Sequence, residues 1–252
     1  VCKKVIFEVI FIKLSNTIVY GLDMKAVVTG GAGFIGSHLV ERLISSGFEV
    51  VVIDNLSTGH AENIEKFKSK IIFENADISE TGSWCELFKG ASYIFHLAAY
   101  NHVGDSFTHI SETINSNLFS TINLLEHGPI YKKFIHMGSS EIYGSQKKIP
   151  FNINEMPNPM SPYAIGKYSS ELYSILKNKI DKRNLICLRP FNTFGPFQSE
   201  KAIIPEIIIK CLMGKPVLTT PGDQTREFNY VENIIEAMLL TSSKLKNFDR
   251  PI

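Results

Sequence analysis

Short apolar runs alternate with amphipathic runs along the chain from residue 24 onward. Continuous apolar runs are typical of strands that are buried on both faces of a sheet. They predict strands at 25–29, 49–53, 70–74, 92–97, 132–137 and 184–189. Apolar residues with helical spacing predict helices near 34–46, 61–67, 83–89, 107–127, 162–179, 200–213 and 230–243. Strands and helices in this alternation favour an α/β fold built on a doubly wound parallel sheet.

The same pattern divides the chain into segments. Met24 directly precedes the first predicted strand, so we expect residues 1–23 to be an extension outside the fold. A stretch rich in proline and asparagine at 150–162 interrupts the alternation and predicts a loop. After residue 190 prolines recur and the periodicity loosens. We therefore expect a main domain at 24–190 and a smaller lobe at 191–252 that lies over the carboxyl ends of the strands.

The turn between the first strand and the first helix is rich in glycine. It carries Gly30, Gly33 and Gly36, and the next strand ends on Asp54. Glycines let the backbone approach a pyrophosphate, and the helix start supplies free N–H groups and a positive dipole end. A carboxylate at the end of the next strand can accept from both hydroxyls of an adenosine ribose and would repel a 2′-phosphate. The motif predicts a Rossmann domain at 24–190 that binds NAD rather than NADP.

Composition narrows the classes of partner. The net charge is +1, with 44% hydrophobic and 20% charged residues, so nothing favours nucleic acid or an anionic membrane as a partner. No apolar run approaches the about 18 residues that a membrane-spanning helix needs. The cysteines are far apart and form no metal-ligand pair or redox motif. They are Cys2, Cys85, Cys187 and Cys211. We expect a cytoplasmic protein with buried thiols and no metal site.

Two residues near the start of the predicted helix 162–179 have the chemistry of a proton carrier. Ser161 is a good N-cap and Pro162 a good first helical residue. Tyr163 and Lys167 are four apart and share one helix face. A nearby ammonium and an oxidised nicotinamide would lower the pKa of the phenol, which is about 10 when free. The phenolate could then take a proton from a sugar hydroxyl while hydride leaves to NAD.

Two further candidates follow the predicted strand 132–137, where the ligand crevice of such a sheet lies. Ser139 could form a hydrogen bond with the hydroxyl that Tyr163 deprotonates. Glu141 could remove a carbon-bound proton made acidic by an adjacent ketone. Turn formation by the serine and simple exposure of the acid are the plainer alternatives.

Taken together, these motifs resemble the extended short-chain dehydrogenase/reductase family, and within it the nucleotide-sugar epimerases and dehydratases. The resemblance is carried by Thr29–Gly36, Asp54–Asn55, Asp77–Ile78, His96–Ala99, Ser139–Gly144 and the pair Tyr163 and Lys167. It implies a catalytic set of Ser139, Glu141, Tyr163 and Lys167. It implies that NAD is contacted by Gly30, Gly33, Phe34, Ile35, Gly36, Asp54, Asn55, Asp77, Ile78, Leu97, Ala98, Ala99, Asn117, Tyr163, Lys167 and Phe191.

The later part of the chain is similar to the substrate lobe of sugar 4,6-dehydratases. That likeness implies a nucleotide-diphosphate sugar as the partner, approached by Asn192 and Lys201 and clamped at its diphosphate by Arg226. An arginine suits this role because its planar fork can donate two bonds to phosphate oxygens. The family also implies a homodimer through the helices near 107–127 and 162–179. Its members run past Ile252, so the substrate lobe is expected to be truncated.

The favoured reaction is a 4,6-dehydration, in which C4 is oxidised by tightly bound NAD, Glu141 removes the C5 proton and water leaves from C6. Ser140 stands where deoxythymidine-sugar dehydratases have an aspartate, which leaves the reaction open. The first alternative is a UDP-hexose 4-epimerase of the UDP-glucose type, for which a residue such as Glu141 is not needed. A UDP-glucuronate decarboxylase and a non-catalytic NAD-binding protein are the others.

Overall fold

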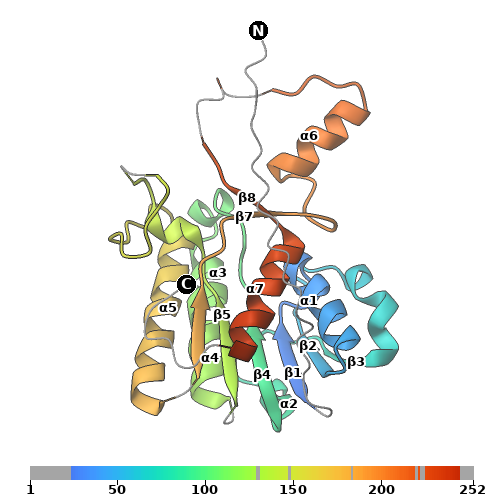
Figure 1. Ribbon diagram of the computed structural model, residues 1–252, viewed down its shortest axis with the longest axis vertical. Helices are drawn as coiled ribbons and strands as arrows, with labels where there is room; N and C mark the ends of the chain where they lie inside the picture. The colour runs from blue at the N-terminus through green and yellow to red at the C-terminus, as the bar shows by residue number, and fades with distance from the viewer. Residues whose placement is uncertain are drawn as a thin grey trace.

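A computed structural model describes residues 24–128, 131–146, 149–182, 184–218, 221 and 225–244. The expected extension at 1–23 and the end of the expected lobe at 245–252 lie outside the described residues. The core is a six-stranded parallel sheet in the order β3-β2-β1-β4-β5-β6 (Figure 1). Its strands are β1 Lys25–Thr29, β2 Glu49–Ile53, β3 Ile71–Glu74, β4 Ala91–His96, β5 Lys133–Met137 and β6 Leu185–Leu188. The order reverses between β1 and β4, the place where doubly wound sheets bind nucleotides.

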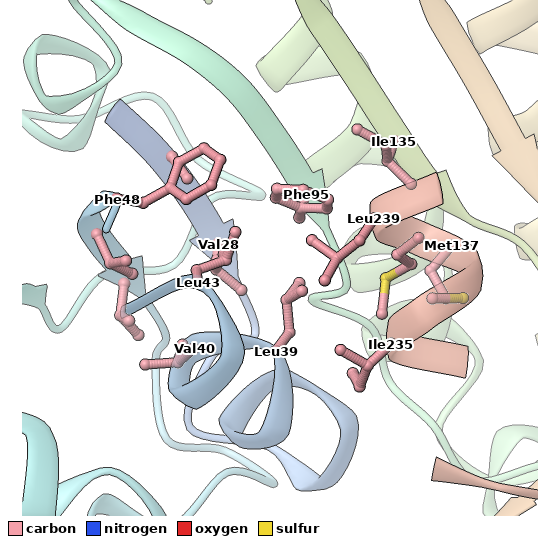
Figure 2. Packing of buried hydrophobic residues seen from close by; sticks show 14 of the residues in the cluster. Val28, Leu39, Val40, Leu43, Phe48, Phe95, Ile135, Met137, Ile235 and Leu239 are labelled. Atoms are coloured by element: carbon pink, nitrogen blue, oxygen red, sulfur yellow. The ribbon is translucent and has the colours of Figure 1, made fainter. Parts of the chain in front are cut away.

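One face of the sheet is covered by α1 (Phe34–Ser45) and α7 (Val231–Lys244). Leu39 and Leu43 of α1 and Ile235 and Leu239 of α7 are buried against every second residue of the strands, such as Val28. Figure 2 shows these side chains meeting between the two helices and the sheet. The prediction of a sheet covered on both faces by helices is confirmed here for the first face.

The opposite face is covered by α2 (Trp84–Leu87), α4 (Ser120–His127) and α5 (Pro162–Asp181). Val27, the neighbour of Val28 on β1, points to this side and joins Trp84, Leu124 and Phe134 in a second core. Side chains alternate between the two faces of a strand, so adjacent apolar residues serve both cores. The predicted strands agree with the observed ones to within one residue at either end.

Three predicted helices differ from the observed structure. Residues 61–67 form two 3₁₀ turns, η1 Ala61–Asn63 and η2 Glu65–Lys70, and 83–89 forms the single turn α2. The segment 107–127 is broken into η3 Asp105–Phe107, α3 Ile110–Ile114, the π turn η4 Asn115–Phe119 and α4. A π turn inserts an extra residue into the helix and often marks a functional site. The short 3₁₀ turn η5 Ser140–Tyr143 follows β5.

A small lobe follows β6, but it does not include α7, which falls within the expected lobe at 191–252 and packs on the main sheet instead. Its strands β7 (Asn192–Phe194) and β8 (Phe228–Tyr230) pair in parallel, and α6 (Ile203–Leu212) lies between them in the chain. In Figure 1, β7, β8 and α6 lie above the six-stranded sheet, beyond the carboxyl ends of its strands. The sequence did not predict β7 and β8. Among the described residues, no helix combines the length and apolar character needed to cross a membrane, and no group of three or more His, Cys, Asp and Glu could hold a metal ion.

Candidate active site

The glycines of the β1–α1 turn are required by packing at two positions. Gly30 has a φ of +72°, and a Cβ there would lie 2.6 Å from the backbone nitrogen of Ala98. A Cβ on Gly36 would lie 2.1 Å from the carbonyl oxygen of Gly30. These two glycines let the turn close tightly and let α1 approach it.

Gly33 is different, because packing alone does not require a glycine at this position. Its backbone is extended, with φ −76° and ψ 177°, and the one close neighbour of an added Cβ would be the Gly30 carbonyl oxygen at 3.2 Å. Gly33 is also the N-cap of α1, where no side chain caps the helix. The first N–H groups of α1, on Phe34, Ile35 and Gly36, therefore have no partner in the preceding turn. A backbone open beside a helix start fits the pyrophosphate of a dinucleotide.

Asp54 lies at the carboxyl end of β2 beside this turn. One carboxylate oxygen accepts from the backbone N–H of Ala32 and the other from that of Leu56, both at 2.9 Å. Burial raises the pKa of the carboxyl group, and these two bonds oppose the rise. A carboxylate has about four acceptor positions, so each oxygen keeps one for a ribose hydroxyl. The predicted ribose contact is compatible with this geometry.

The carboxyl ends of β2 and β3 bring two more predicted residues together. The Asn55 amide donates to the Asp77 carboxylate at 3.0 Å, and both residues are exposed. Ile78 is buried in the second core, so its side chain packs against the protein, and its carbonyl oxygen accepts from Asn123. An adenine contact by Ile78 therefore stays a prediction for its backbone only.

The segment after β4 forms the other side of the turn. Leu97, Ala98 and Ala99 are half-buried there. Asn117, at the centre of the π turn η4, holds this segment with two bonds to the backbone of Tyr100, at 2.8 and 3.2 Å. Asn117 is fully buried, so the role that the structure gives it is to position the segment.

The predicted proton-transfer residues converge at the end of β5. Ser139 caps η5 and accepts from the N–H of Glu141 at 3.2 Å. Burial raises the pKa of Tyr163 to about 12, the Ser139 hydroxyl opposes that rise through a hydrogen bond, and the Glu141 carboxylate adds to it. Ser161 caps α5 as predicted, by accepting from the N–H of Ala164. The structure thus brings the serine, the acid and the phenol within interaction range.

Lys167 is buried on the same face of α5 as Tyr163. Its ammonium donates to the carbonyl oxygen of Met137 at 2.9 Å. Burial lowers the pKa of Lys167 to about 8. In the structure described, burial is the largest cause of the raised pKa of Tyr163, and the Lys167 ammonium is bonded to β5. The lowering of that pKa by the ammonium together with NAD stays a prediction.

Asn101 is a site residue that the sequence did not single out. The Tyr163 hydroxyl donates to its side-chain oxygen at 3.3 Å. Asn101 lies in the loop after β4, and no motif marks it. Its one sequence signal is its place directly after the run that ends at Ala99.

An aromatic group borders η5. Phe191 stacks on Tyr143 with ring centroids 6.5 Å apart and contacts Phe151 at 5.8 Å. Arg189 lies over the Tyr143 ring at 4.8 Å and forms a buried two-bond pair with Glu171. The Arg189–Glu171 pair links the end of β6 to α5. The contact of Phe191 with NAD stays a prediction.

The small lobe brings two of the three predicted substrate residues together. Asn192 begins β7 and donates to the carbonyl oxygen of Glu227, the neighbour of Arg226. Arg226 is exposed and donates to the carbonyl oxygen of Thr225. Lys201 is exposed ahead of α6, and its backbone N–H bonds Ser199. Contacts of all three with a substrate remain predictions.

Known proteins share both the sequence and the fold. Residues 26–251 match the model of the NAD dependent epimerase/dehydratase family. A protein of Methanocaldococcus jannaschii, provisionally named a UDP-glucose 4-epimerase, is 36% identical over 222 residues, which are 85% of this chain and 72% of that protein. The crystal structure of UDP-glucose 4-epimerase from Thermotoga maritima with UDP-glucose has a TM-score of 0.83 and 33% identity over 89% of this chain and 75% of that one.

A dehydratase has the same fold. dTDP-glucose 4,6-dehydratase from Streptomyces venezuelae, with NAD and a thymidine nucleotide bound, has a TM-score of 0.82 and 28% identity, and the match covers 88% of this chain and 73% of that one. The present chain thus spans about three quarters of each relative's length.

The glycine turn, the acid after β2 and the tyrosine–lysine helix define an NAD-dependent enzyme that acts on nucleotide sugars. The chain belongs to the NAD-dependent epimerase/dehydratase family. The predicted family, the Rossmann-type fold and the NAD cofactor are confirmed.

Proposed function

We propose that the protein is an NAD-dependent 4-epimerase of a UDP-hexose, the first alternative to dehydration. The observation that carries the proposal is that the protein's more similar relatives are named as epimerases. Two that are 36% and 33% identical are named UDP-glucose 4-epimerases, whereas the dehydratase is 28% identical. The residues at the end of β5 support the same choice.

Ser140 and Glu141 provide that local support. Loss of water from C6 needs an acid for the leaving hydroxyl as well as a base at C5. Ser140 is half-buried beside Glu141 and offers only a hydroxyl, which is a poor proton donor at neutral pH. Glu141 is exposed. An epimerase needs neither residue for acid–base chemistry at C5 or C6.

The residues of the protein would then transfer one proton from the sugar's 4-hydroxyl to Tyr163 and later back to the sugar. NAD, when bound, supplies a hydride acceptor and donor beside C4 of the sugar. Tyr163 takes the proton of the 4-hydroxyl as that carbon becomes a ketone, and Ser139 orients the hydroxyl oxygen. Once the ketone presents its opposite face, Tyr163 returns the proton. The sugar keeps every atom, and no NAD is consumed.

The proposal is tested by incubating the protein with UDP-, dTDP-, GDP- and CDP-sugars and following the products by mass spectrometry and proton NMR. A 4-epimerase converts UDP-galactose and UDP-glucose into each other with no change of mass. Loss of water would identify a dehydratase and loss of carbon dioxide a decarboxylase. Tight NAD binding without any turnover would favour a non-catalytic protein.

Replacing Glu141 separates the two leading reactions. In an epimerase, we expect Glu141→Gln to keep the rate within about threefold, because no C5 proton is removed. A dehydratase would lose about a hundredfold or more in rate.

The Glu141 carboxylate raises the pKa of Tyr163, so its removal should lower that pKa. The rise of kcat with pH should therefore move to lower pH, as steady-state rates across pH would show. A hundredfold loss at all pH values would argue for dehydration.

We also propose a homodimer formed through the outer face of α5. Ile165, Leu172, Leu176 and Ile180 repeat along that face at helical spacing and are 48–64% exposed. Four large apolar side chains in line on one helix are typical of an interface. The occupant expected there is a second copy of the same helix, because two-fold symmetry lets an apolar face cover itself.

Charge on that face should abolish the dimer. We expect the double change Leu172→Glu and Leu176→Glu to give a monomer in analytical ultracentrifugation, because two carboxylates on each copy would be buried against two others. Leu212→Glu on α6, where the side chain is 83% exposed, is the matched control and should leave the mass unchanged. A double variant that sediments like the parent would refute this interface.

A further inference from the structure

Two buried histidines lie side by side in the sheet below the catalytic residues. His96 ends β4 and His136 precedes the last residue of β5, and the two are paired in register. Their ring centroids are 5.4 Å apart, and the residues are 2% and 1% exposed. Neither is part of the predicted site. Each occupies a core position, where a polar side chain must be hydrogen-bonded.

His96 lies within a chain of bonds that runs in one direction. The Thr29 hydroxyl accepts from the Ala98 N–H at 3.3 Å and lies 2.8 Å from Nδ1 of His96. Nε2 of His96 lies 2.8 Å from the Thr121 hydroxyl, which donates to the carbonyl oxygen of Asn117. Thr121 can therefore accept from the ring, and Thr29 can donate to it. The bonds fit a neutral ring that carries its proton on Nε2.

His136 begins a second chain, which ends at the catalytic lysine. Nε2 of His136 lies 3.1 Å from the Ser170 hydroxyl, and that hydroxyl donates to the carbonyl oxygen of Lys167 at 2.9 Å. Ser170 must therefore accept from Nε2–H. In return, the Lys167 ammonium donates to the carbonyl oxygen of Met137, which follows His136 on β5. The turn of α5 that carries Lys167 is thus bonded to β5 in both directions.

We propose that His136 and Ser170 are positioning residues for Lys167, which fix the helix turn that carries its ammonium against the end of β5. The positioning of Lys167 does not depend on the proposed function; only the expected effect on the reaction rate rests on it. Tyr163 is one turn before Lys167 on α5, and Ser139 is two residues after Met137, so the same two bonds set the spacing between the phenol and the serine.

The arrangement works with uncharged imidazoles. Nδ1 of His136 is buried and has no hydrogen-bond partner among the described residues, so a second proton there would have no acceptor. The ionisable groups around it are His96 on β4, Lys167 on α5 and Cys187, its register partner on β6. Burial, together with the charge of Lys167, lowers the pKa of both histidines, that of His96 to about 3. Of these groups, the ammonium of Lys167 is then the one that carries a positive charge.

Ser170→Ala tests the proposal, with Ser174→Ala as a matched control. Ser174 is one turn further along α5, equally buried, and its hydroxyl has no partner in the described part of the chain. Without the Ser170 bond, water should reach Lys167 and its pKa should rise from about 8 toward the ordinary value of a lysine. The pKa can be measured by NMR on protein carrying ¹³C at lysine Cε, with Lys167→Arg to assign the signal.

The kinetic expectation is a loss of about tenfold in kcat with KM unchanged, because a misplaced proton-transfer group slows chemistry rather than binding. Ser174→Ala should change neither kcat nor the Lys167 titration. Equal results for the two serine variants would overturn the proposal. The titration needs no substrate, so a shifted Lys167 pKa in a protein that turns over no UDP-hexose would refute the proposed function and leave this inference standing.

A second pair of variants guards against a merely structural effect. His136→Gln keeps an N–H near the position of Nε2 and should retain most of the rate and the depressed Lys167 pKa. His136→Leu fills the space without a donor and should reproduce Ser170→Ala in both measurements. If glutamine and leucine gave the same rate and the same Lys167 pKa, the hydrogen bond from His136 would have no positioning role.

Discussion

Replacing Tyr163 with phenylalanine is expected to lower kcat for the conversion of UDP-galactose to UDP-glucose by about a thousandfold, within the usual range for loss of a general base. The substitution removes one oxygen from a side chain that is 6% exposed, so the packing of α5 should be kept. The oxygen lost is the one that donates to Asn101 and interacts with Ser139. Steady-state kinetics with both UDP-hexoses would measure the effect.

Tyr168→Phe provides the control, since that tyrosine is on the same helix and outside the site. It should keep the parent rate, and both variants should retain NAD equally. A fall of less than about tenfold for Tyr163→Phe would show that another group carries the proton. The raised pKa of Tyr163 also implies that the phenol holds its proton at neutral pH, so the parent rate should increase as the pH is raised above neutrality.

The second large effect is expected in the glycine turn, where two neighbouring substitutions should act on different properties. Gly36→Ala would place a Cβ 2.1 Å from the Gly30 carbonyl oxygen, a clash that only a backbone shift can relieve. We expect a loss of about 3 kcal/mol in the free energy of unfolding, at the upper end for overpacking. Thermal unfolding should move down by roughly 10 °C. Scanning calorimetry of the protein without added nucleotide measures this.

Gly33→Ala is the counterpart. Its Cβ would meet one carbonyl oxygen at 3.2 Å in an extended backbone that any residue adopts, so stability should change by less than about 1 kcal/mol. The methyl group would occupy the space beside the α1 start that a pyrophosphate needs, and NAD affinity should fall at least about tenfold, as isothermal titration calorimetry would show. Unchanged affinity in Gly33→Ala would place the pyrophosphate elsewhere.

The parts of the fold that follow from local pattern could be predicted. Strands β1, β2, β4, β5 and β6 are largely buried on both faces and therefore appear as continuous apolar runs, whereas the edge strand β3 is only half-buried. The helix α5 carries its own start signals in Ser161 and Pro162. By contrast, β7 and β8 are three residues each, and no local pattern marks them because their pairing joins segments more than thirty residues apart.

The break in the predicted helix 107–127 has a tertiary cause that local periodicity cannot show. Asn117 bonds both backbone groups of Tyr100, and its Cβ packs against Gly166 of α5, so an added Cβ there would lie 3.0 Å away. The π turn η4 accommodates these contacts. The same holds for the site. The motif gave the positions of Tyr163 and Lys167, but the bond from Lys167 to Met137 and the role of Asn101 arise only when β4, β5 and α5 come together.

The sequence also could not decide the reaction. Glu141 favoured dehydration when it was considered as a residue type, but in the fold it is exposed and next to Ser140, which cannot serve as the second acid. Its carboxylate also acts on the site by its charge, which adds to the burial that raises the pKa of Tyr163. The choice between the reactions therefore depends on what happens at C4.

The most direct measurement follows a deuterium atom placed at C4 of UDP-glucose. We expect UDP-galactose of unchanged mass in which the deuterium is still at C4, because hydride leaves and returns to the same carbon on opposite faces. Deuterium found at C6 of a product that has lost water would identify a 4,6-dehydratase and contradict the account.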